Sequence, residues 1–306
     1  MRVSLVSNWH ERCGVAEYAR NLEKELGKQF EVVREEKVYA AQGDVAVINW
    51  HPARLVLPPG DVRDLKARGL KTILIVHNSA DSYMALENHP AHWADAVVAH
   101  QKMESNVEIT YIPFGIPEVD ELRSPGTETY IGIAGFPYAW KRFNLVADVA
   151  KRLGGKAVLI APQHDMGDST TPINDIQRIY PDASVLRHWM TQEEVVRTLS
   201  GCTLNIFWYQ HMPPDDLQGQ SGSVLMGVAA GRPMIVSKHP KLAHVAVYED
   251  ELYVVEKEED VLPTAREIVE KLAAGEPVKM PGRIKKEMGW GTTGRIYGEL
   301  IRKVAA

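Results

Sequence analysis

The sequence has little of what marks three large classes of protein. It contains two cysteines in 306 residues, Cys13 and Cys202, too few and too far apart for a disulfide framework or a cysteine-based metal site. No apolar run approaches the roughly 20 residues that a membrane-spanning helix requires, and residues 1–7 are too short and polar for a secretory signal. The net charge of −5 gives no general attraction to nucleic acid. We therefore expect a cytoplasmic protein whose membrane contact, if any, is peripheral.

What the chain does have is a series of short apolar segments that alternate with helical patterns, twice over. In the first half, strands are expected at 3–6, 31–34, 44–49, 71–76, 94–99 and 107–112, with helices at 15–26 and 61–68. After a stretch rich in proline, glycine and acidic residues, 113–126, strands are expected at 130–134, 156–160, 185–188, 203–208, 234–236 and 251–255. Helices are expected at 143–153, 192–199 and 261–274, with one or two more within 283–304.

Strands that are apolar throughout and separated by helices form parallel sheets covered on both faces. The sequence thus predicts an α/β protein with two open parallel sheets that face each other across a cleft. Open sheets of this kind bind ligands beyond the carboxyl ends of their strands, so the loops that follow strands are where function is expected.

Two loops of the first half carry polar side chains at such strand ends. The loop 7–14 is more polar than a tight turn requires, and its candidate binding residues are Asn8, His10, Glu11, Arg12 and Gly14. His77 follows the strand 71–76, where an imidazole can donate a hydrogen bond or a proton, or can equally be a satisfied structural residue. The histidines at 89, 92 and 100 with Asp95 lack a recognised ligand spacing, so no metal site is expected.

Two loops of the second half suit a diphosphate. A basic pair stands where a helix begins, which opposes the helix dipole unless an anion is bound nearby, although a solvated pair explains it equally well. A Ser-Gly-Ser triplet leads into an apolar helix whose first N–H groups can bind an anion, although an ordinary helix cap has the same sequence. The expected anion ligands are Gly135, Lys141, Arg142, Ser221, Gly222 and Ser223.

A turn and a loop complete the candidate site of the second half. The turn 187–190 can hold a nucleobase through His188, Trp189 and Met190, although Trp189 is explained as well by a place in the core. The loop 207–216, which combines aromatic and acidic residues, is a candidate lid or wall beside a bound sugar.

The order of these segments resembles glycosyltransferase family 4, whose members have two Rossmann-like domains in the GT-B arrangement. The resemblance covers nearly the whole chain and rests on segments in the expected order: 13–18 (CGVAEY), 75–78 (IVHN), 112–117 (IPFGIP), 135 with 140–143 (G, WKRF) and 229–236 (AAGRPMIV). It implies an acceptor-side domain at 1–122, a nucleotide-sugar donor domain at 123–285 and a closing helix at 286–306 that packs back towards the first domain.

The sequence departs from the family within the donor motif. The family's paired glutamates, one near the transferred sugar and one on the ribose, fall on Gln218 and Met226. The family's diphosphate-binding arginine falls on Phe136. Gln218 can still hydrogen-bond a sugar hydroxyl, whereas Met226 cannot serve a ribose hydroxyl as a carboxylate does.

The resemblance implies a hexosyltransferase that moves a sugar from a nucleotide-diphosphate sugar to a carbohydrate or other small acceptor, with retention and with no metal or other cofactor required. It assigns His77 and Gln218 to the transferred sugar, residues 188–190 and Met226 to the nucleotide, and residues 8–14 to the acceptor. Two alternatives stay open. One is a binding protein of the same fold without turnover, which the missing glutamates favour, and the other is a nucleotide-sugar epimerase or a phosphorylase.

Overall fold

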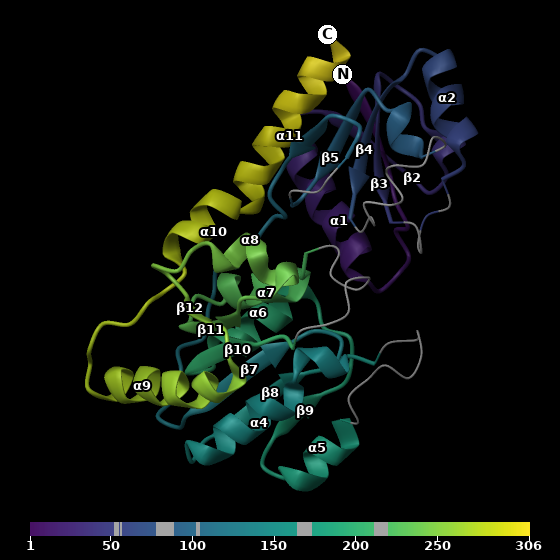
Figure 1. Cartoon of the computed structure of the whole chain (residues 1–306). Coiled ribbons are helices and arrows are strands. Elements are labelled where there is room, and N and C mark those ends of the chain that lie inside the picture. The colour runs from purple at the N-terminus through teal and green to yellow at the C-terminus, as the bar shows by residue number, and fades with distance from the viewer. Residues whose placement is uncertain (52–54, 56, 78–88, 102–104, 164–172, 211–219) are drawn as a thin grey trace. The chain divides into compact units, whose positions relative to one another are not determined.

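The structure is a computed structural model that describes residues 1–51, 55, 57–77, 89–101, 105–163, 173–210 and 220–306. The described chain divides into two compact units, each with its own sheet (Figure 1). Unit 1 consists mainly of Met1–Gly115 and Met288–Ala306, and unit 2 of the described residues between Ile116 and Glu287.

Unit 1 is built on a six-stranded sheet in the order β2-β1-β3-β4-β5-β6, in which every neighbouring pair is parallel. Its strands are β1 (Arg2–Val6), β2 (Glu31–Glu35), β3 (Val45–Trp50), β4 (Lys71–Val76), β5 (Ala96–Ala99) and β6 (Ile109–Tyr111). All of β3 is buried because both faces of the sheet are covered. The strand order reverses between β1 and β3, which is where a doubly wound sheet of this kind binds ligands.

The two faces of this sheet pack against different helices. Val45 and Val47 of β3 point to the face covered by α1 (Gly14–Leu26) and α11 (Trp290–Ala305). Ala46 and Ile48 point to the face covered by α2 (Pro59–Ala67). This alternation along one strand follows from the two-residue period of side chains in a sheet.

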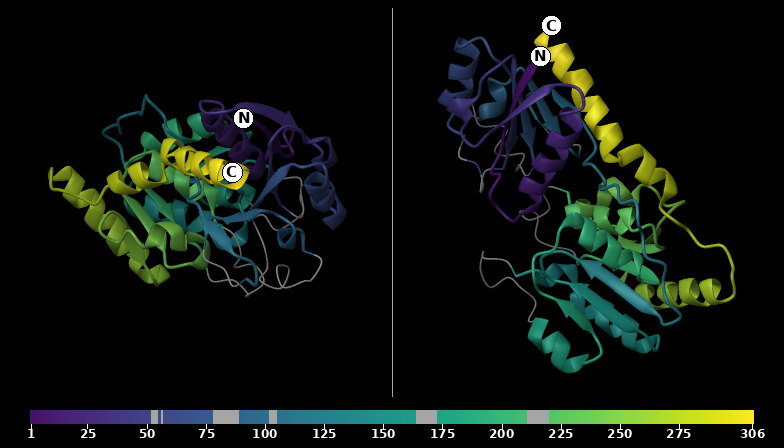
Figure 2. Two further views of the ribbon diagram at one scale, coloured as in Figure 1. Left: turned by 90° about the horizontal axis from the view of Figure 1, so that it is seen from above. Right: turned by 180° about the vertical axis from the view of Figure 1, so that it is seen from behind.

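The C-terminal helix α11 is part of unit 1 and lies beside α1 (Figure 2). The hydroxyl groups of Tyr18 and Tyr297 are 2.8 Å apart in the buried contact between the two helices. Gly294 allows the close approach, because a Cβ atom at this position would lie 2.4 Å from the Cβ of Glu25. Helix α11 is therefore fixed to unit 1 by both apolar packing and a buried hydrogen bond.

Unit 2 also contains a six-stranded parallel sheet, in the order β12-β11-β10-β7-β8-β9. Its strands are β7 (Tyr130–Ala134), β8 (Lys156–Ile160), β9 (Ser184–Leu186), β10 (Leu204–Phe207), β11 (Met234–Ser237) and β12 (Tyr253–Val255). Its helices are α4 (Phe143–Arg152), α5 (Ile173–Ile179), α6 (Gln192–Ser200), α7 (Gly222–Ala229), α8 (Ala243–Ala246), α9 (Val261–Ala273) and α10 (Gly282–Met288). The order reverses between β7 and β10, as in the Rossmann fold, so the loops after these strands mark its ligand-binding edge.

The expectation of an α/β protein with two Rossmann-like parallel sheets is confirmed. The strands β4, β7 and β8 have the bounds that the sequence predicts. Helices α5 and α8 were not predicted, because they are too short for a helical pattern to stand out. Within the described residues, every helix is too short or too polar to cross a membrane.

Candidate functional site

In unit 2, the loop after β7 brings a buried lysine to the start of α7. Lys141 ends the short 3-10 turn Ala139–Lys141, and its side chain is only 6% exposed. Its Nζ lies 3.4 Å from the Oγ of Ser223, in the first turn of α7. A lysine from one strand-end loop thus meets a helix N-terminus at the edge where the strand order of the sheet reverses.

The surroundings of Lys141 are aromatic and contain no compensating negative charge. Its Nζ lies 5.9, 5.3 and 5.7 Å from the ring centroids of Tyr138, Trp140 and Tyr209. In the described part of the chain, no carboxylate is within ion-pair distance of it. Burial lowers the pKa of Lys141 to about 7, with a further contribution from the positive charge of Lys241. A bound anion would remove this penalty and hold the lysine in its charged form.

Three hydroxyl groups form a closed network beside Lys141. The hydroxyl of Tyr209 lies 2.8 Å from the Oγ of Ser221 and 3.1 Å from the Oγ of Ser223, and the two serine oxygens are 3.0 Å apart. Burial raises the pKa of Tyr209 to about 12, so its hydroxyl is neutral. The backbone N–H of Ser221 donates to the carbonyl of Lys241 over 3.0 Å, which fixes the entry into α7. The network therefore holds both serines in place without charge.

Gly135 is the residue that lets these groups converge. Its φ is 128°, in the region that favours glycine. A Cβ atom on it would lie 2.6 Å from the Nζ of Lys141 and 2.9 Å from the Oγ of Ser223. The glycine predicted as an anion ligand is thus required by both the backbone conformation and the space above the lysine.

Arg142 does not join Lys141, although the sequence suggests a basic pair. Its backbone is left-handed, with φ 52° and ψ 47°. Its guanidinium donates to the Oε1 of Glu258 over 2.6 Å and to the Oε1 of Gln210 over 3.1 Å. The left-handed backbone of Arg142 directs its side chain away from that of Lys141. Arg142 therefore pairs with the carboxylate of Glu258, while Lys141 points to α7.

The other residues predicted for the donor side lie in several places. His188 is exposed, whereas Trp189 and Met190 are half-buried after β9. The ring centroid of Trp189 is 6.1 Å from that of Phe136, which places Trp189 close to the Gly135 loop. Met226 is half-buried in α7. Gln218 lies outside the described residues.

In unit 1, polar side chains from three strand ends form a hydrogen-bonded chain. The Nε2 of His77, directly after β4, lies 2.5 Å from the Oδ1 of Asn49 in β3. The Nδ2 of Asn49 donates to the Oγ of Ser7 over 2.9 Å and to the carbonyl of Val15 over 3.0 Å. Asn49 was not predicted from the sequence, although an asparagine near the end of an otherwise apolar strand was a signal.

Burial keeps His77 and His100 neutral near pH 7. Its ring centroid lies 4.7 Å from that of Tyr18 and 5.0 Å from that of His100. Burial, followed by the proximity of His100 and His51, holds the pKa of His77 well below its usual range. Burial lowers the pKa of His100 to about 4 as well. The uncharged histidines can therefore exchange hydrogen bonds near pH 7 but do not carry positive charge.

The histidines considered as metal ligands have other partners. The Nδ1 of His89 accepts a hydrogen bond from the N–H of Ala91 over 3.2 Å. Asp95 accepts from the N–H of Thr72 over 2.8 Å and pairs with Lys66. Across the described residues, no group of three or more histidine, cysteine or acidic side chains is arranged to hold a metal ion.

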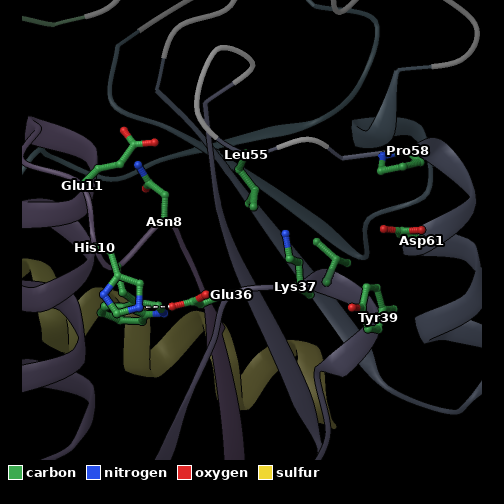
Figure 3. Close-up of a pocket in the computed structure, with 11 residues that line it drawn as sticks. Asn8, His10, Glu11, Glu36, Lys37, Tyr39, Leu55, Pro58 and Asp61 are labelled. Atoms are coloured by element: carbon green, nitrogen blue, oxygen red, sulfur yellow. Dashed lines mark ion pairs between the residues drawn. The ribbon is translucent and has the colours of Figure 1, made fainter. Parts of the chain in front are cut away.

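A pocket of about 440 Å³ opens beside the loop after β1 (Figure 3). It gathers three of the five residues predicted for the acceptor side: Asn8, His10 and Glu11. Its other lining residues, which the sequence did not indicate, are Trp9, Glu36, Lys37, Val38, Tyr39, Leu55, Pro58 and Asp61.

The polar side chains of this pocket come from both of its walls. His10 forms an ion pair with Glu36, while Asp61 stands on the opposite side and Lys37 lies between them in Figure 3. Arg12 and Gly14 are exposed and are not among the lining residues. The pocket thus offers hydrogen-bond donors and acceptors from side chains of positive and of negative charge. Such a lining suits a ligand with many hydroxyl groups.

Comparisons with known proteins add to the description of the fold. No protein-family model matches the sequence, and no curated protein matches it either. One similar solved structure is AviGT4, a glycosyltransferase involved in avilamycin A biosynthesis (TM-score 0.59, 15% identity, covering 100% of this chain and 98% of that one). Another is sucrose-phosphate synthase from Thermosynechococcus elongatus (TM-score 0.72, 11% identity, 99% of both chains).

A third is HepE from Anabaena in complex with UDP (TM-score 0.64, 10% identity, 100% of this chain and 97% of that one). These matches extend over both units, and they share the fold with this chain at low sequence identity. The chain therefore has the GT-B fold, with two Rossmann-like domains.

Proposed function

We propose that the protein is a glycosyltransferase that takes its sugar from a nucleotide-diphosphate donor. The observation that carries the proposal is Lys141, a buried amine beside Ser223 and the start of α7. It lies at the ligand-binding edge of a Rossmann-like sheet and has no carboxylate partner in the described residues. Of the solved structures with the same fold, HepE binds UDP and UDP-glucose.

The chemistry follows from the charge of the leaving group. Negative charge grows on the diphosphate as the glycosidic bond breaks, and groups already aimed at that charge stabilise the transition state. Lys141 supplies a cation, and the first N–H groups of α7 supply oriented dipoles. Because the protein supplies the positive charge itself, the proposal requires no metal or other cofactor.

The residues proposed for the sugar and for the acceptor are those that the sequence suggests. His77, together with Gln218 as the sequence suggests, contacts the transferred sugar, and transfer proceeds with retention. The pocket lined by Asn8, His10 and Glu11 binds a carbohydrate or another small hydroxylated acceptor. On the donor side, Trp189 forms one wall for the nucleobase beside the Gly135 loop.

Two measurements test this function. A thermal-shift screen against UDP, GDP, ADP and their sugars should raise the melting temperature with at least one of them, because a ligand that binds only the folded state stabilises it. With the donor identified, Lys141→Ala should lower the rate of transfer by about tenfold or more, the loss expected when a charge-assisted contact to the transition state is removed. Unchanged turnover in a folded variant would overturn the assignment of Lys141.

A binding protein without turnover is the second candidate. Met226 is the observation in its favour, because a half-buried thioether stands where the resembling family has a ribose-binding carboxylate. Hydrolysis of the donor without an acceptor separates the two functions, since transferases lose some donor to water. A protein that binds a nucleotide sugar but neither transfers nor hydrolyses it would be the binding protein.

A further inference from the structure

Asn49 is a buried polar side chain within the most deeply buried strand of unit 1. It is fully buried, and all three of its hydrogen bonds join different segments of the chain. Its Nδ2 donates to Ser7 after β1 and to Val15 in α1, and its Oδ1 faces His77 after β4. Such a connected amide fixes the orientation of its neighbours, because each broken bond would leave a buried polar group without a partner.

The identity of these partners determines the direction of each bond. A backbone carbonyl can only accept, so the atom of Asn49 that faces Val15 is the amide nitrogen. The amide oxygen therefore faces His77, and an amide oxygen can only accept. The hydrogen between Asn49 and His77 must then be on the Nε2 of His77. In a neutral imidazole, this leaves Nδ1 with a lone pair.

The surroundings of His77 favour the neutral imidazole. The ring packs edge-to-face against Tyr18 and lies beside His100 and Phe114. The Nδ1 of His100 donates to the carbonyl of Ile112 over 2.9 Å, and burial lowers the pKa of His100 to about 4, so His100 is neutral with its hydrogen on Nδ1. No acidic side chain is found within ion-pair distance of His77 in the part of the chain that the structure describes. Among the same residues, the hydrogen bond found for the His77 ring is that of Nε2 with Asn49, and the ring is half-buried.

We propose that Asn49 is a positioning residue that fixes His77 as the neutral tautomer with the hydrogen on Nε2, so that Nδ1 accepts a hydrogen bond from a hydroxyl of the transferred sugar. This inference rests on the proposed function in its assignment of the sugar to His77. It reverses the expectation from the sequence that His77 donates a hydrogen bond or a proton. A fixed acceptor discriminates among sugars, because a donor that lacks the matching hydroxyl leaves Nδ1 without a partner in the complex.

The tautomer can be measured directly on the full-length protein labelled with ¹⁵N-histidine. Long-range ¹H–¹⁵N spectra distinguish a protonated ring nitrogen from one with a lone pair. Between pH 6 and 8, Nε2 of His77 should be the protonated nitrogen and Nδ1 the other. A spectrum in which Nδ1 is protonated, or both nitrogens are, would overturn the inference. This readout needs no activity and no variant, so it stands even if the protein proves not to transfer a sugar.

The Asn49→Asp variant tests the positioning role. A carboxylate beside Nε2 favours the doubly protonated imidazolium, which has no acceptor at Nδ1. Transfer should fall by about tenfold or more, as expected from one lost buried hydrogen bond, while the affinity for UDP stays within about twofold of the original. An unchanged rate together with a doubly protonated His77 would contradict the role of Nδ1.

Asn205→Asp is a matched control. Asn205 is a fully buried asparagine in β10 whose Nδ2 faces the carbonyl of Leu199 over 3.4 Å. The same substitution there should leave the ¹⁵N signals of His77 unchanged. If transfer is absent from the original protein, the proposed function fails while the spectra still test the tautomer. If transfer is present but the tautomer is the other one, only the positioning inference fails.

Discussion

The strand-end edges of the two units share a topology but differ in charge. In unit 1, Asn49 and His77 form a neutral hydrogen-bonded chain, and the neighbouring His100 is also uncharged. In unit 2, the corresponding edge contains the amine of Lys141 beside the hydroxyl of Ser223. In a fold of this kind, the topology determines where a ligand binds, and the side chains at the strand ends determine the chemistry of that ligand. Unit 1 suits neutral hydroxyl groups and unit 2 suits an anion.

The largest effect on this difference in charge is expected when the cation of unit 2 is removed. Lys141→Met keeps an apolar chain of similar length, so it should weaken UDP binding by about tenfold to a hundredfold, the range for a lost charge-assisted hydrogen bond. The melting temperature of the ligand-free variant should rise, because the buried amine no longer has to be desolvated. Calorimetric titration with UDP and thermal unfolding measure both effects. Weaker binding together with a lower melting temperature would instead indicate a structural role.

Gly135→Ala should have the next largest effect. The added Cβ would lie 2.6 Å from the Nζ of Lys141, and the φ of 128° is strained for alanine. We expect UDP affinity to fall by about tenfold and the free energy of unfolding by about 1–3 kcal/mol. Gly154→Ala is the matched control, because φ there is 68° and no atom lies within 4 Å of the new Cβ. It should lower stability without changing UDP binding, and equal losses of affinity in both variants would contradict the steric explanation.

Most of the fold could be predicted from the sequence, because it depends on local patterns. Strands β4, β7 and β8 are mainly apolar runs with polar or glycine-containing ends. The ends of such a run indicate where the strand begins and ends. Lys141 and the serines at 221 and 223 were also indicated locally, because they stand where a helix begins. These features require no knowledge of which segments are neighbours in space.

The missed features depend on contacts between distant segments. Asn49 matters only because β3 pairs with β4 on one side and β1 on the other, which brings His77 and Ser7 to the same amide. The separation of Lys141 from Arg142 depends on a left-handed backbone at Arg142. This conformation is typical of glycine or asparagine, so an arginine in the sequence does not predict it. Of the loop 207–216, expected as a lid or wall, residues 211–216 lie outside the described residues, and Tyr209 is buried with its hydroxyl beside both serines.

The pH dependence of UDP binding should distinguish the two edges. With a pKa of about 7 in the ligand-free protein, Lys141 is charged below that pH and must take up a proton on binding above it. Affinity should therefore fall by up to about tenfold per pH unit as the pH rises above this pKa. His77 and His100 add nothing in this window, because the pKa of His100 is about 4 and that of His77 is also lowered. Lys141→Met should remove this dependence of UDP affinity on pH. If the variant keeps the dependence, a group other than Lys141 takes up the proton on binding.

Removing one hydroxyl beneath the anion site should have a moderate effect. Tyr209→Phe keeps the ring near Lys141 but loses the bonds to Ser221 and Ser223. The two serines can still bond to each other, so we expect a loss of about 1 kcal/mol in stability and of about threefold to tenfold in UDP affinity. Equilibrium unfolding in urea and titration with UDP measure the two. A loss of affinity as large as that of Lys141→Met would mean that the hydroxyl contacts the ligand itself.

The smallest expected effect belongs to Arg142, although the sequence places it with Lys141 among the expected anion ligands. Asparagine tolerates the left-handed backbone at this position, so Arg142→Asn removes the guanidinium without adding strain. The lost ion pair with Glu258 is partly exposed, and such pairs contribute about 0–1 kcal/mol. UDP affinity should stay within about twofold, since the guanidinium is directed to Glu258 and not to Ser223. If Arg142→Asn instead weakens binding as much as Lys141→Met, the guanidinium must leave Glu258 when the diphosphate binds. The anion would then be held by two cations, and the contrast in charge between the two edges would be greater than the ligand-free geometry indicates.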